Sequence, residues 1–490
     1  MKKLFFLFFF AFLFSTTSKA QDSKELVITD QDLLELNLAA KKGSAMAQYN
    51  LGCFYLYGLK IDKDYDKAFY WFQKAANQDH ALAQCNLGAC YNNGWGVKED
   101  KQQAFFWYQK SANNGENLGQ YNLGLFYDLG KFVEKDDRQA FYWYKKAAEQ
   151  GNVEAQNKVG HAYYNGKGIE KDYEKAFSWF RIAAQKNNLE ALNNLSACYF
   201  YGHGVKPDYK QSFLLIKEAA EGGLAIAQYT LGYKYENGYG VNKDLNKALY
   251  WYRKSAEQGY DEAQHNLGFY YYNGIVVSQD YKQAFYWYSK AAEQGFSKSQ
   301  TNLGICYFTG NGAPKDYNKA VTWYKKAAEQ GSTMGQNNLG FCYLNGLGVQ
   351  QDYKQALKWF SKAAEQGLSN SQYFLGVLYD FGYGVPQDYK QAVYWYSKAA
   401  EQGDSDAQND LGACYLNGTG VPKDYKKAVY WFSKAAEQES AMSQNNLGNC
   451  YFNGYGVKID YDTAIYWYRK AAKNGSEEAI EMLKIIHVSW

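Results

Sequence analysis

The most regular chemical feature of the sequence is a carboxylate that recurs every 36 residues. Acidic side chains at a fixed spacing could bind metal ions or act as general acids and bases. An Asp directly before a helix more commonly caps it, because the carboxylate accepts a hydrogen bond from an unpaired backbone N–H. We favour the capping role for this aspartate column. Its twelve members are Asp64, Asp100, Asp136, Asp172, Asp208, Asp244, Asp280, Asp316, Asp352, Asp388, Asp424 and Asp460.

A second signal supports capping. In six copies a Gln stands three residues after the Asp, where its side chain would return a bond to the backbone and complete a capping box. These residues are Gln103, Gln139, Gln211, Gln283, Gln355 and Gln391.

Other reactive side chains lack the arrangement that catalysis needs. The five histidines fall at unrelated places in the 36-residue period, and no S-x-x-K, G-x-S-x-G, H-E-x-x-H or phosphate-binding loop is present. The eight cysteines form no C-x-x-C pair, the spacing typical of zinc sites. Six share one place in the period, where neighbours would stand roughly 10 Å apart, beyond the roughly 7 Å that a disulfide spans. We expect no catalytic residue, no metal and no cofactor, and buried thiols in place of a disulfide framework.

The elements that hold these residues follow from the repeat itself. Its marker is a Leu-Gly dipeptide, first at Leu51 and last at Leu447, replaced by Val159-Gly160 and Leu195-Ser196 in two copies. A Tyr four residues after this reference Leu and a Gly seven after it occur in all twelve copies. Gly at that place suits the left-handed end of a helix, so each unit predicts a helix A before the Gly and a helix B after the Asp. Helix pairs of this kind must stack to bury their apolar sides. The sequence therefore predicts an all-α, right-handed superhelical solenoid.

Helix B carries one apolar stripe, exemplified by Ala392, Trp395, Tyr396, Ala399 and Ala400. The Trp is present in eleven of twelve copies. A ligand-binding aromatic ladder is one interpretation, but so regular a place between small Ala side chains favours a core role.

Helix A is where the copies differ. The places two before, two after and five after the reference Leu lie on one face of a helix and vary between copies. Tyr and Asn side chains there offer stacking area and adaptable hydrogen bonds. We predict that the A helices line the concave wall and bind a partner. The predicted binding residues are Tyr49, Tyr121, Tyr229, Tyr233, His265, Phe269, Tyr272, Asn337 and Tyr373.

Eight copies also have an Asn directly before the reference Leu. This asparagine ladder could clamp the backbone of an extended peptide or bond between neighbouring helices, and the sequence favours neither. Its members are Asn50, Asn86, Asn122, Asn194, Asn266, Asn302, Asn338 and Asn446.

The fifth copy departs most from the pattern. Leu192 replaces Gln, Ser196 replaces Gly, Ser212 replaces Ala, and Leu215 with Ile216 replaces the aromatic pair. None of these is a strong acid, base or nucleophile, so we expect drift or a local bend and no active site.

Charge and the first residues bound the partner and the compartment. The 53 Lys and Arg nearly balance the 50 Asp and Glu, and no segment gathers one sign as a nucleic-acid surface does. Two lysines precede the apolar run 4–14 and a small-x-Ala pattern at 18–20, which predicts a signal peptide over 1–20. Eleven apolar residues are too few for the roughly 20 of a membrane span. We expect a mature chain from Gln21, periplasmic or extracellular, with no membrane span.

Residues 407–439, AQNDLGACYLNGTGVPKDYKKAVYWFSKAAEQE, carry a family resemblance. They resemble the Sel-one-like repeat, a longer relative of the tetratricopeptide repeat, and the resemblance covers residues 44–475. It places an N-terminal segment with a lone capping helix at 21–43 and a closing helix at 476–490. Some secreted relatives carry a disulfide in each repeat and bind penicillin-like compounds, but the cysteines here do not follow that pattern.

The resemblance implies a non-enzymatic scaffold that binds a protein or peptide on its concave face, with no nucleic-acid partner. Envelope processes or host contact are the settings it implies. The alternative is a binder or hydrolase of cell-wall or β-lactam-like ligands, and a glycan or peptidoglycan partner stays open because Tyr and Asn also suit sugars.

Overall fold

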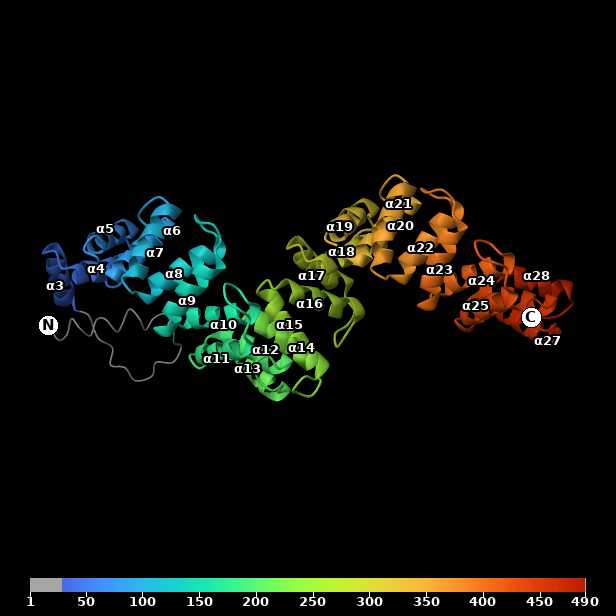
Figure 1. Cartoon of the computed structure of the whole chain (residues 1–490), viewed down its shortest axis with the longest axis horizontal. Coiled ribbons are helices and arrows are strands. Elements are labelled where there is room, and N and C mark those ends of the chain that lie inside the picture. The colour runs from blue at the N-terminus through green and yellow to red at the C-terminus, as the bar shows by residue number, and fades with distance from the viewer. Residues whose placement is uncertain (1–28, 490) are drawn as a thin grey trace. The chain divides into compact units, whose positions relative to one another are not determined.

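A computed structural model describes residues 29–489, which form 26 helices and no strand (Figure 1). The expected signal peptide, residues 1–20, lies outside the described residues. The first helix, α3 (Asp30–Lys41), and the last, α28 (Glu477–Ile485), fall in the two segments expected to cap the array. The all-helical prediction is confirmed over the described part of the chain.

Between these two helices, A and B helices alternate. The A helices are α4 (Ala45–Tyr57), α6 (Ala81–Asn93), α8 (Asn117–Leu129), α10 (Val153–Asn165), α12 (Leu189–Tyr201), α14 (Ala225–Asn237), α16 (Asp261–Asn273), α18 (Ser297–Thr309), α20 (Thr333–Asn345), α22 (Ser369–Phe381), α24 (Ser405–Asn417) and α26 (Ala441–Asn453). The B helices are α5 (Tyr65–Ala76), α7 (Lys101–Asn113), α9 (Asp137–Glu149), α11 (Tyr173–Ala184), α13 (Tyr209–Glu221), α15 (Leu245–Glu257), α17 (Tyr281–Glu293), α19 (Tyr317–Glu329), α21 (Tyr353–Glu365), α23 (Tyr389–Glu401), α25 (Tyr425–Glu437) and α27 (Tyr461–Lys473).

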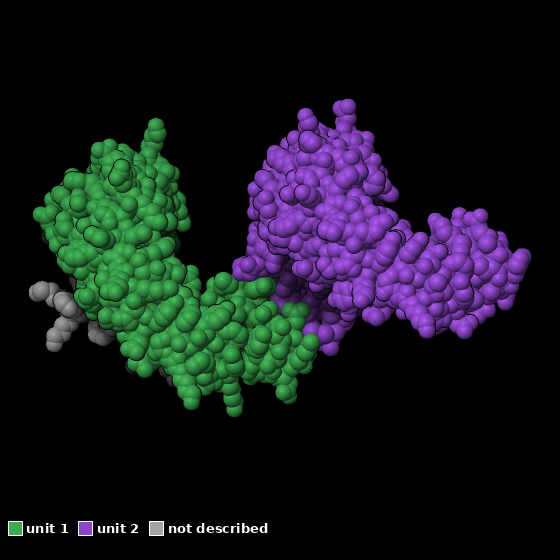
Figure 2. Space-filling model, turned by 45° about the vertical axis from the view of Figure 1, so that its right-hand side comes forward, with its two compact units in different colours: residues 1–244 green, residues 245–490 purple. Residues whose placement is uncertain are grey.

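The chain divides into two compact units, Met1–Asp244 and Leu245–Trp490 (Figure 2). Within each unit every helix packs against the helix that follows it in sequence. Each unit is thus a row of helices in which contacts are made between near neighbours in the sequence, as expected of stacked repeats.

The predicted helix boundaries are confirmed. All twelve A helices end at a Gly with positive φ, from 65° at Gly130 to 85° at Gly310. At the eleven B helices other than α15, the Asp of the aspartate column is the N-cap and its side chain accepts a bond from a backbone N–H of the first turn. Capping accounts for these eleven carboxylates.

The capping boxes expected from six glutamines are not formed. In each of these helices the Asp accepts from the backbone N–H of the Gln, but the Gln side chain returns no bond. The single hydrogen bond from a backbone N–H to the Asp side chain is sufficient to cap the start of the helix. The one complete box described is at α3, between Thr29 and Asp32.

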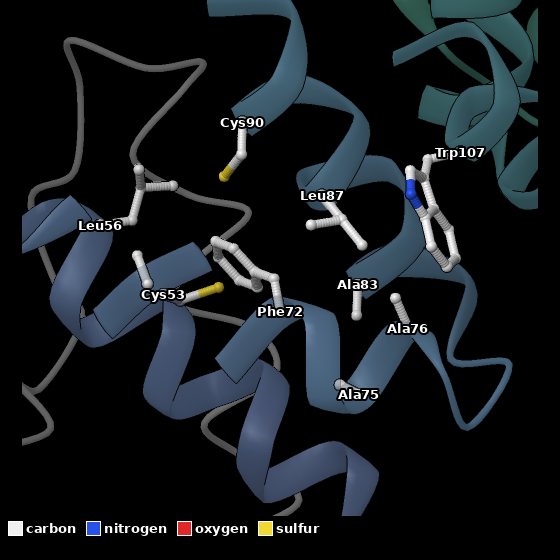
Figure 3. Close-up of a cluster of buried hydrophobic side chains, with 10 residues drawn as sticks. Cys53, Leu56, Phe72, Ala75, Ala76, Ala83, Leu87, Cys90 and Trp107 are labelled. Atoms are coloured by element: carbon white, nitrogen blue, oxygen red, sulfur yellow. The ribbon is translucent and has the colours of Figure 1, made fainter. Parts of the chain in front are cut away.

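In ten helix pairs the core is an aromatic ring of helix B lying on the Gly of the Leu-Gly dipeptide. Phe72 of α5 is fully buried beside α4 and α6 with Leu87 and Cys90 (Figure 3). A Cβ added to Gly52 would lie only 2.7 Å from Phe72, and equivalent additions in nine further pairs would lie 2.5–3.0 Å from the corresponding ring. Only glycine permits helices A and B to approach this closely.

A buried Gln three residues before the reference Leu joins successive repeats. The Gln372 amide donates to the carbonyl oxygen of Ala364 at the end of the preceding helix B (3.1 Å). Its own oxygen accepts from Gln402 at the end of the helix B that follows (2.7 Å). One side chain therefore satisfies polar groups on three consecutive helices, which fixes the spacing of the stack.

The cysteines and tryptophans serve the core. All eight cysteines are buried and unpaired, and burial raises the pKa of each thiol to about 12. Trp107 and Trp359 are buried, and the other tryptophans of the column are half-buried. Trp107 lies in one buried cluster with Leu87 and Ala83 of its own repeat and with Ala75 and Ala76 of the repeat before it, so the column packs at the junction between repeats, and its core role is confirmed.

Two glycines of one turn allow a matched test of these boundaries. A Cβ at Gly346 (φ 67°) would meet nothing closer than 3.4 Å, whereas a Cβ at Gly348 (φ 70°) would overlap the backbone carbonyl of Tyr317 in the preceding helix B. We expect Gly346→Ala to lower the free energy of unfolding by about 1 kcal/mol through backbone strain alone. We expect Gly348→Ala to cost about 1–3 kcal/mol more, because the overlap adds to the same strain. Urea denaturation of both variants measures the difference, and equal losses would contradict the assigned contact between the turn and α19.

Candidate functional site

The tyrosines two residues before the reference Leu are half-buried rather than free in a groove. Tyr121 packs on the Tyr144 ring of its own repeat with ring centres 5.8 Å apart, and Tyr373 packs on Tyr396 at 5.9 Å. Tyr49 packs on Phe72 at 6.1 Å. Burial raises the pKa of these three tyrosines. Each of these tyrosines therefore packs between the buried ring of helix B and the surface, and only part of its own ring is accessible to a partner.

The polar residues at the same place connect repeats. Asn337 is only 8% exposed; its side-chain oxygen accepts from Ser371 of the next repeat (2.8 Å). His265 is half-buried with its Nδ1 2.9 Å from Ser299 Oγ; burial, with a smaller effect of Lys298, lowers the pKa of His265 to about 4. The sequence argument expected Asn337 to be exposed, but its small amide is buried between the A helices α20 and α22.

The asparagine ladder also bonds between repeats. Asn194 donates to Asn157 of the preceding repeat at 3.0 Å, and Asn446 donates to Asn409 in the same way at 3.0 Å. Asn122 donates to the sulfur of Cys85 at 3.5 Å. These contacts favour the second of the two roles left open by the sequence, a link between neighbouring helices.

Two predicted residues are well exposed. Tyr233 on α14 is 41% exposed and Phe269 on α16 is 44% exposed. Tyr229 and Tyr272 are half-buried, and the Tyr272 hydroxyl accepts from Asn311 of the next repeat (3.2 Å). The place two residues after the reference Leu is thus the most open of the three that the sequence singled out.

Sequence reasoning missed two further exposed places on the A helices, five before and six after the reference Leu. Some copies have a polar residue at these places, and others have a large apolar residue that is exposed. The apolar members are Met46, Leu118, Ile226, Met334 and Met442 at the first place and Tyr57, Leu129, Tyr201 and Phe381 at the second. The first place lies seven residues before that of Tyr233 and the second lies four residues after it, so all three share one helix face. The variation of these places between copies was the signal that could have found them. We call the exposed places at −5, +2 and +6 the A face.

Three surface hollows lie on the A face. One of about 190 Å³ is lined by residues of α12 and α14, including Phe200, Tyr201 and Tyr233. Another of about 320 Å³ is lined by Tyr373, Asp406 and Asp410 from α22 and α24, with residues of α26. Within the second, burial raises the pKa of Asp410 to about 6.

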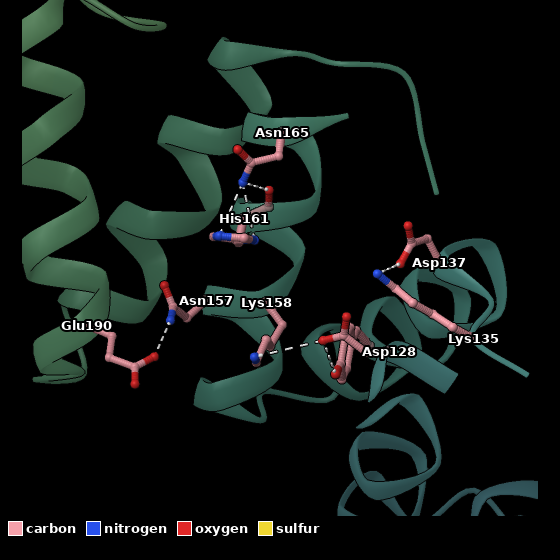
Figure 4. Close-up of polar contacts among 9 residues, drawn as sticks. Asp128, Lys135, Asp137, Asn157, Lys158, His161, Asn165 and Glu190 are labelled. Carbon is pink, nitrogen blue, oxygen red and sulfur yellow. Dashed lines mark hydrogen bonds and ion pairs between the residues drawn. The ribbon is translucent and has the colours of Figure 1, made fainter. Parts of the chain in front are cut away.

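The third hollow, also about 320 Å³, lies between α8, α9 and α10. Lys158 reaches Asp128 at 4.0 Å (Figure 4), and the Tyr144 hydroxyl donates to the same carboxylate at 3.1 Å. Neighbouring His161 lies beside Asn165 on α10 (Figure 4). Unlike the core, the lining of each hollow is particular to its repeats, so each presents different chemistry.

The first hollow adjoins the most unusual side chain of the core, Lys234. It occupies the place three residues after the reference Leu, which is Cys in six copies, yet it is only 3% exposed. Its ammonium donates to Ser212 Oγ (2.8 Å) and lies 4.4 Å from the centre of the Phe200 ring. Desolvation lowers the pKa of Lys234 to about 8. The sequence argument examined the fifth copy alone and so did not connect Ser196 and Ser212 with this lysine of the sixth.

The B helices carry a competing exposed column. Seven tyrosines two residues after the conserved Ala are exposed: Tyr70, Tyr142, Tyr250, Tyr286, Tyr394, Tyr430 and Tyr466. Each packs edge-on against the Trp that follows it, as Tyr250 does at 5.1 Å, and the Lys four residues later lies over its ring. These rings are therefore already engaged within their own helix.

Among the described residues no group of three His, Cys, Asp or Glu side chains is placed to hold a metal ion. Nor does any helix in this part of the chain have the length and apolar character required to span a bilayer.

The fold and the A face define a class of protein: a helical repeat array whose core residues recur while its exposed residues vary. The chain belongs to the Sel1 repeat family, which matches twelve consecutive 36-residue segments from residue 45 to residue 476. The suspected family is thereby confirmed. Sel1-repeat arrays are scaffolds of the protein-interaction type and are generally non-catalytic.

Among solved structures, the chain is similar to a protective antigen present in uropathogenic Escherichia coli strains that displays the SLR fold. The two are 35% identical, with 94% of this chain and 98% of the antigen covered and a TM-score of 0.69. A Sel1 repeat protein from Oxalobacter formigenes is also 35% identical, with 63% of this chain and 90% of that chain covered and a TM-score of 0.49. Comparison with curated proteins gives no match.

Burial of the Lys234 ammonium predicts how the stability of the chain depends on pH. Because the pKa of Lys234 is about 8 in the folded chain and about 10.4 when unfolded, the unfolded state binds more protons between these values. The contribution of Lys234 therefore becomes more favourable as pH rises from about 8 to 10.4 and is least favourable at pH 7. We expect Lys234→Met to stabilise the chain at pH 7 by about 1–3 kcal/mol, and the gain to shrink toward pH 10.

Urea denaturation of both proteins at pH 7 and pH 10 measures this difference. Tyr201 and Tyr233, which line the same hollow as Lys234, are the same in both proteins, so the comparison isolates the change at position 234. A stability difference that does not change with pH would contradict the buried, desolvated position of Lys234.

Proposed function

We propose that the chain is an exported, non-enzymatic scaffold that binds a protein or peptide partner on the A face. The observation that carries the proposal is the coincidence of three hollows with exposed apolar side chains on the same helices. Large apolar side chains exposed around concave pockets are typical anchors of protein interfaces. Their variation from copy to copy would let one array recognise an irregular partner surface.

The contrast between the two sets of exposed rings supports the A face over the B helices. A tyrosine such as Tyr250 is 54% exposed, but Tyr stands at this place in seven of the twelve copies, and Tyr250 is covered on two sides by Trp251 and Lys254. Tyr233 and Ile226 instead border a hollow. Tyr233 has one ring neighbour, Tyr239 at 5.9 Å, but a partner gains more by burying side chains at the edge of a pocket than rings covered on two sides within their own helix.

Double variants on the two kinds of face test this proposal. We expect Ile226→Ala with Tyr233→Ala, and separately Phe269→Ala with Met334→Ala, to weaken the Kd for the partner at least tenfold, because each removes two anchors. The melting temperature should fall by no more than about 4 °C, since exposed side chains contribute little to folding. The matched control is Tyr250→Ala with Tyr286→Ala on the B helices, which should bind like the parent.

The partner for that measurement is found by photo-crosslinking. A photoreactive amino acid at position 233 or 269 should label the same protein in envelope and secreted fractions, and one at position 250 should not. A glycan partner that stacks on the tyrosines of helix B would reverse the ranking of the variants. Loss of a measurable hydrolytic activity through one His or Asp substitution, with binding unaffected by the A-face changes, would favour the enzymatic alternative.

Export is the second part of the proposal and rests on residues 1–20. We expect bacteria expressing the whole chain to yield a protein whose intact mass corresponds to a start at Gln21, recovered from the periplasm or medium. Replacing the apolar run 4–14 with alternating Ser and Asn should keep the full-length chain in the cytoplasm, because the signal needs a continuous apolar segment. Recovery of the unprocessed parent chain from the cytoplasm would contradict export.

A further inference from the structure

The fifth and sixth repeats share a coordinated change in their core. In ten other helix pairs an aromatic ring of helix B lies on the Gly of helix A. In the fifth repeat Ile216 replaces the ring and Ser196 replaces the Gly, and both are buried. The shorter side chain leaves room that Ser196 and Ser212 fill with polar groups, and Lys234 of the sixth repeat extends into the same space.

The two serines are satisfied by each other. Ser212 Oγ donates to the carbonyl oxygen of Ser196 (2.7 Å), and Ser196 Oγ donates to the carbonyl oxygen of Ser212 (2.8 Å). Lys234 Nζ donates one bond to Ser212 Oγ (2.8 Å), leaving two of its three protons for other acceptors. The serines therefore hold the lysine in place but supply no negative charge.

A buried ammonium calls for an anion. Among the described residues, the ion pairs include none with Lys234. Desolvation is the one cause that lowers the pKa of its ammonium. A cation that is 3% exposed without a counter-charge is costly to fold. An anion bound beside Lys234 would offset that cost, because it would supply the counter-charge that the folded chain does not provide.

The adjoining hollow determines which anion fits. Lys234 and Ser196 line it together with Phe200, Tyr201, Ile226 and Tyr233. The volume of about 190 Å³ is below that of a usual drug-sized site and admits one small group. A single cation matches a single negative charge, and walls of aromatic and aliphatic carbon match an apolar body. Asn193, also in the lining, has an amide that can donate to a second oxygen.

We propose that the hollow between α12 and α14 binds a carboxylate group attached to a small apolar or aromatic body, with Lys234 as the cation that receives it. The carboxylate would accept from Lys234 Nζ and the ring would lie among Phe200, Ile226 and Tyr233. This site does not depend on the proposed protein partner. The carboxylate can belong to a free organic acid or to the end of a peptide, and the two sources share this chemistry.

Titration calorimetry at pH 7 with two matched probe pairs tests the site. Benzoate and benzamide have the same ring but differ in charge, and N-acetyl-phenylalanine and its amide make the same comparison for a peptide end. We expect at least one carboxylate to bind and its uncharged partner to bind at least tenfold more weakly. Benzoate as the better ligand indicates a free acid, and N-acetyl-phenylalanine as the better ligand indicates a peptide end.

Variants separate the site from general affinity for anions. Lys234→Met should weaken carboxylate binding at least tenfold, and Lys234→Cys, which introduces the residue of six other copies, should do the same if the Met variant fails to fold. Lys158→Met is the matched control, because it removes a lysine of another A helix next to another hollow, and it should bind like the parent. No binding of either carboxylate at 20 mM, or equal binding by parent and Lys234 variants, would overturn the proposal. Because none of these probes is a protein, the outcome is independent of the A-face experiment.

Discussion

The contact on which the array depends is that of a helix-B ring with the backbone of a helix-A glycine. A side chain as small as a methyl group at Gly52 or Gly412 would lie 2.7 Å from that ring, so neither helix can approach its partner unless the residue is Gly. The ring in turn brings the reference Leu and the small alanines into the same buried layer. With each pair set at this short distance, a buried Gln such as Gln372 can bridge three consecutive helices.

The places where that contact is altered are the places where the chain acquires particular chemistry. In the fifth repeat Ile216 replaces the ring, and a polar group of Ser196, Ser212 and Lys234 occupies the vacated core. In the ten pairs that keep the ring, the core recurs while the A face varies, and Tyr233 and Phe269 of that face are 41% and 44% exposed. Constancy in the core and freedom on the surface are what a recognition scaffold needs.

The sequence was sufficient to predict the helices, their ends and their order, because each depends on a local signal such as the Asp of the N-cap or the Gly of the C-cap. The candidate site was harder to predict. Variation at the place of Asn337 suggested exposure, yet its bond to Ser371 belongs to the joint between repeats, which only the register of neighbouring helices reveals. Lys234 was missed because its significance depends on Ser212, 22 residues away.

A double-mutant cycle at Gly412 and Phe432 tests the central contact most directly, since Phe432 is fully buried and lies on that glycine. In the parent, Gly412→Ala should lower the free energy of unfolding by about 1–3 kcal/mol through overlap with the ring. In a Phe432→Ile background, which copies the fifth repeat, the same change should be neutral or stabilise by up to about 1 kcal/mol, because Ala favours a helix over Gly. The account predicts this coupling of about 1–3 kcal/mol between the two sites. Additive effects of the two substitutions would contradict it.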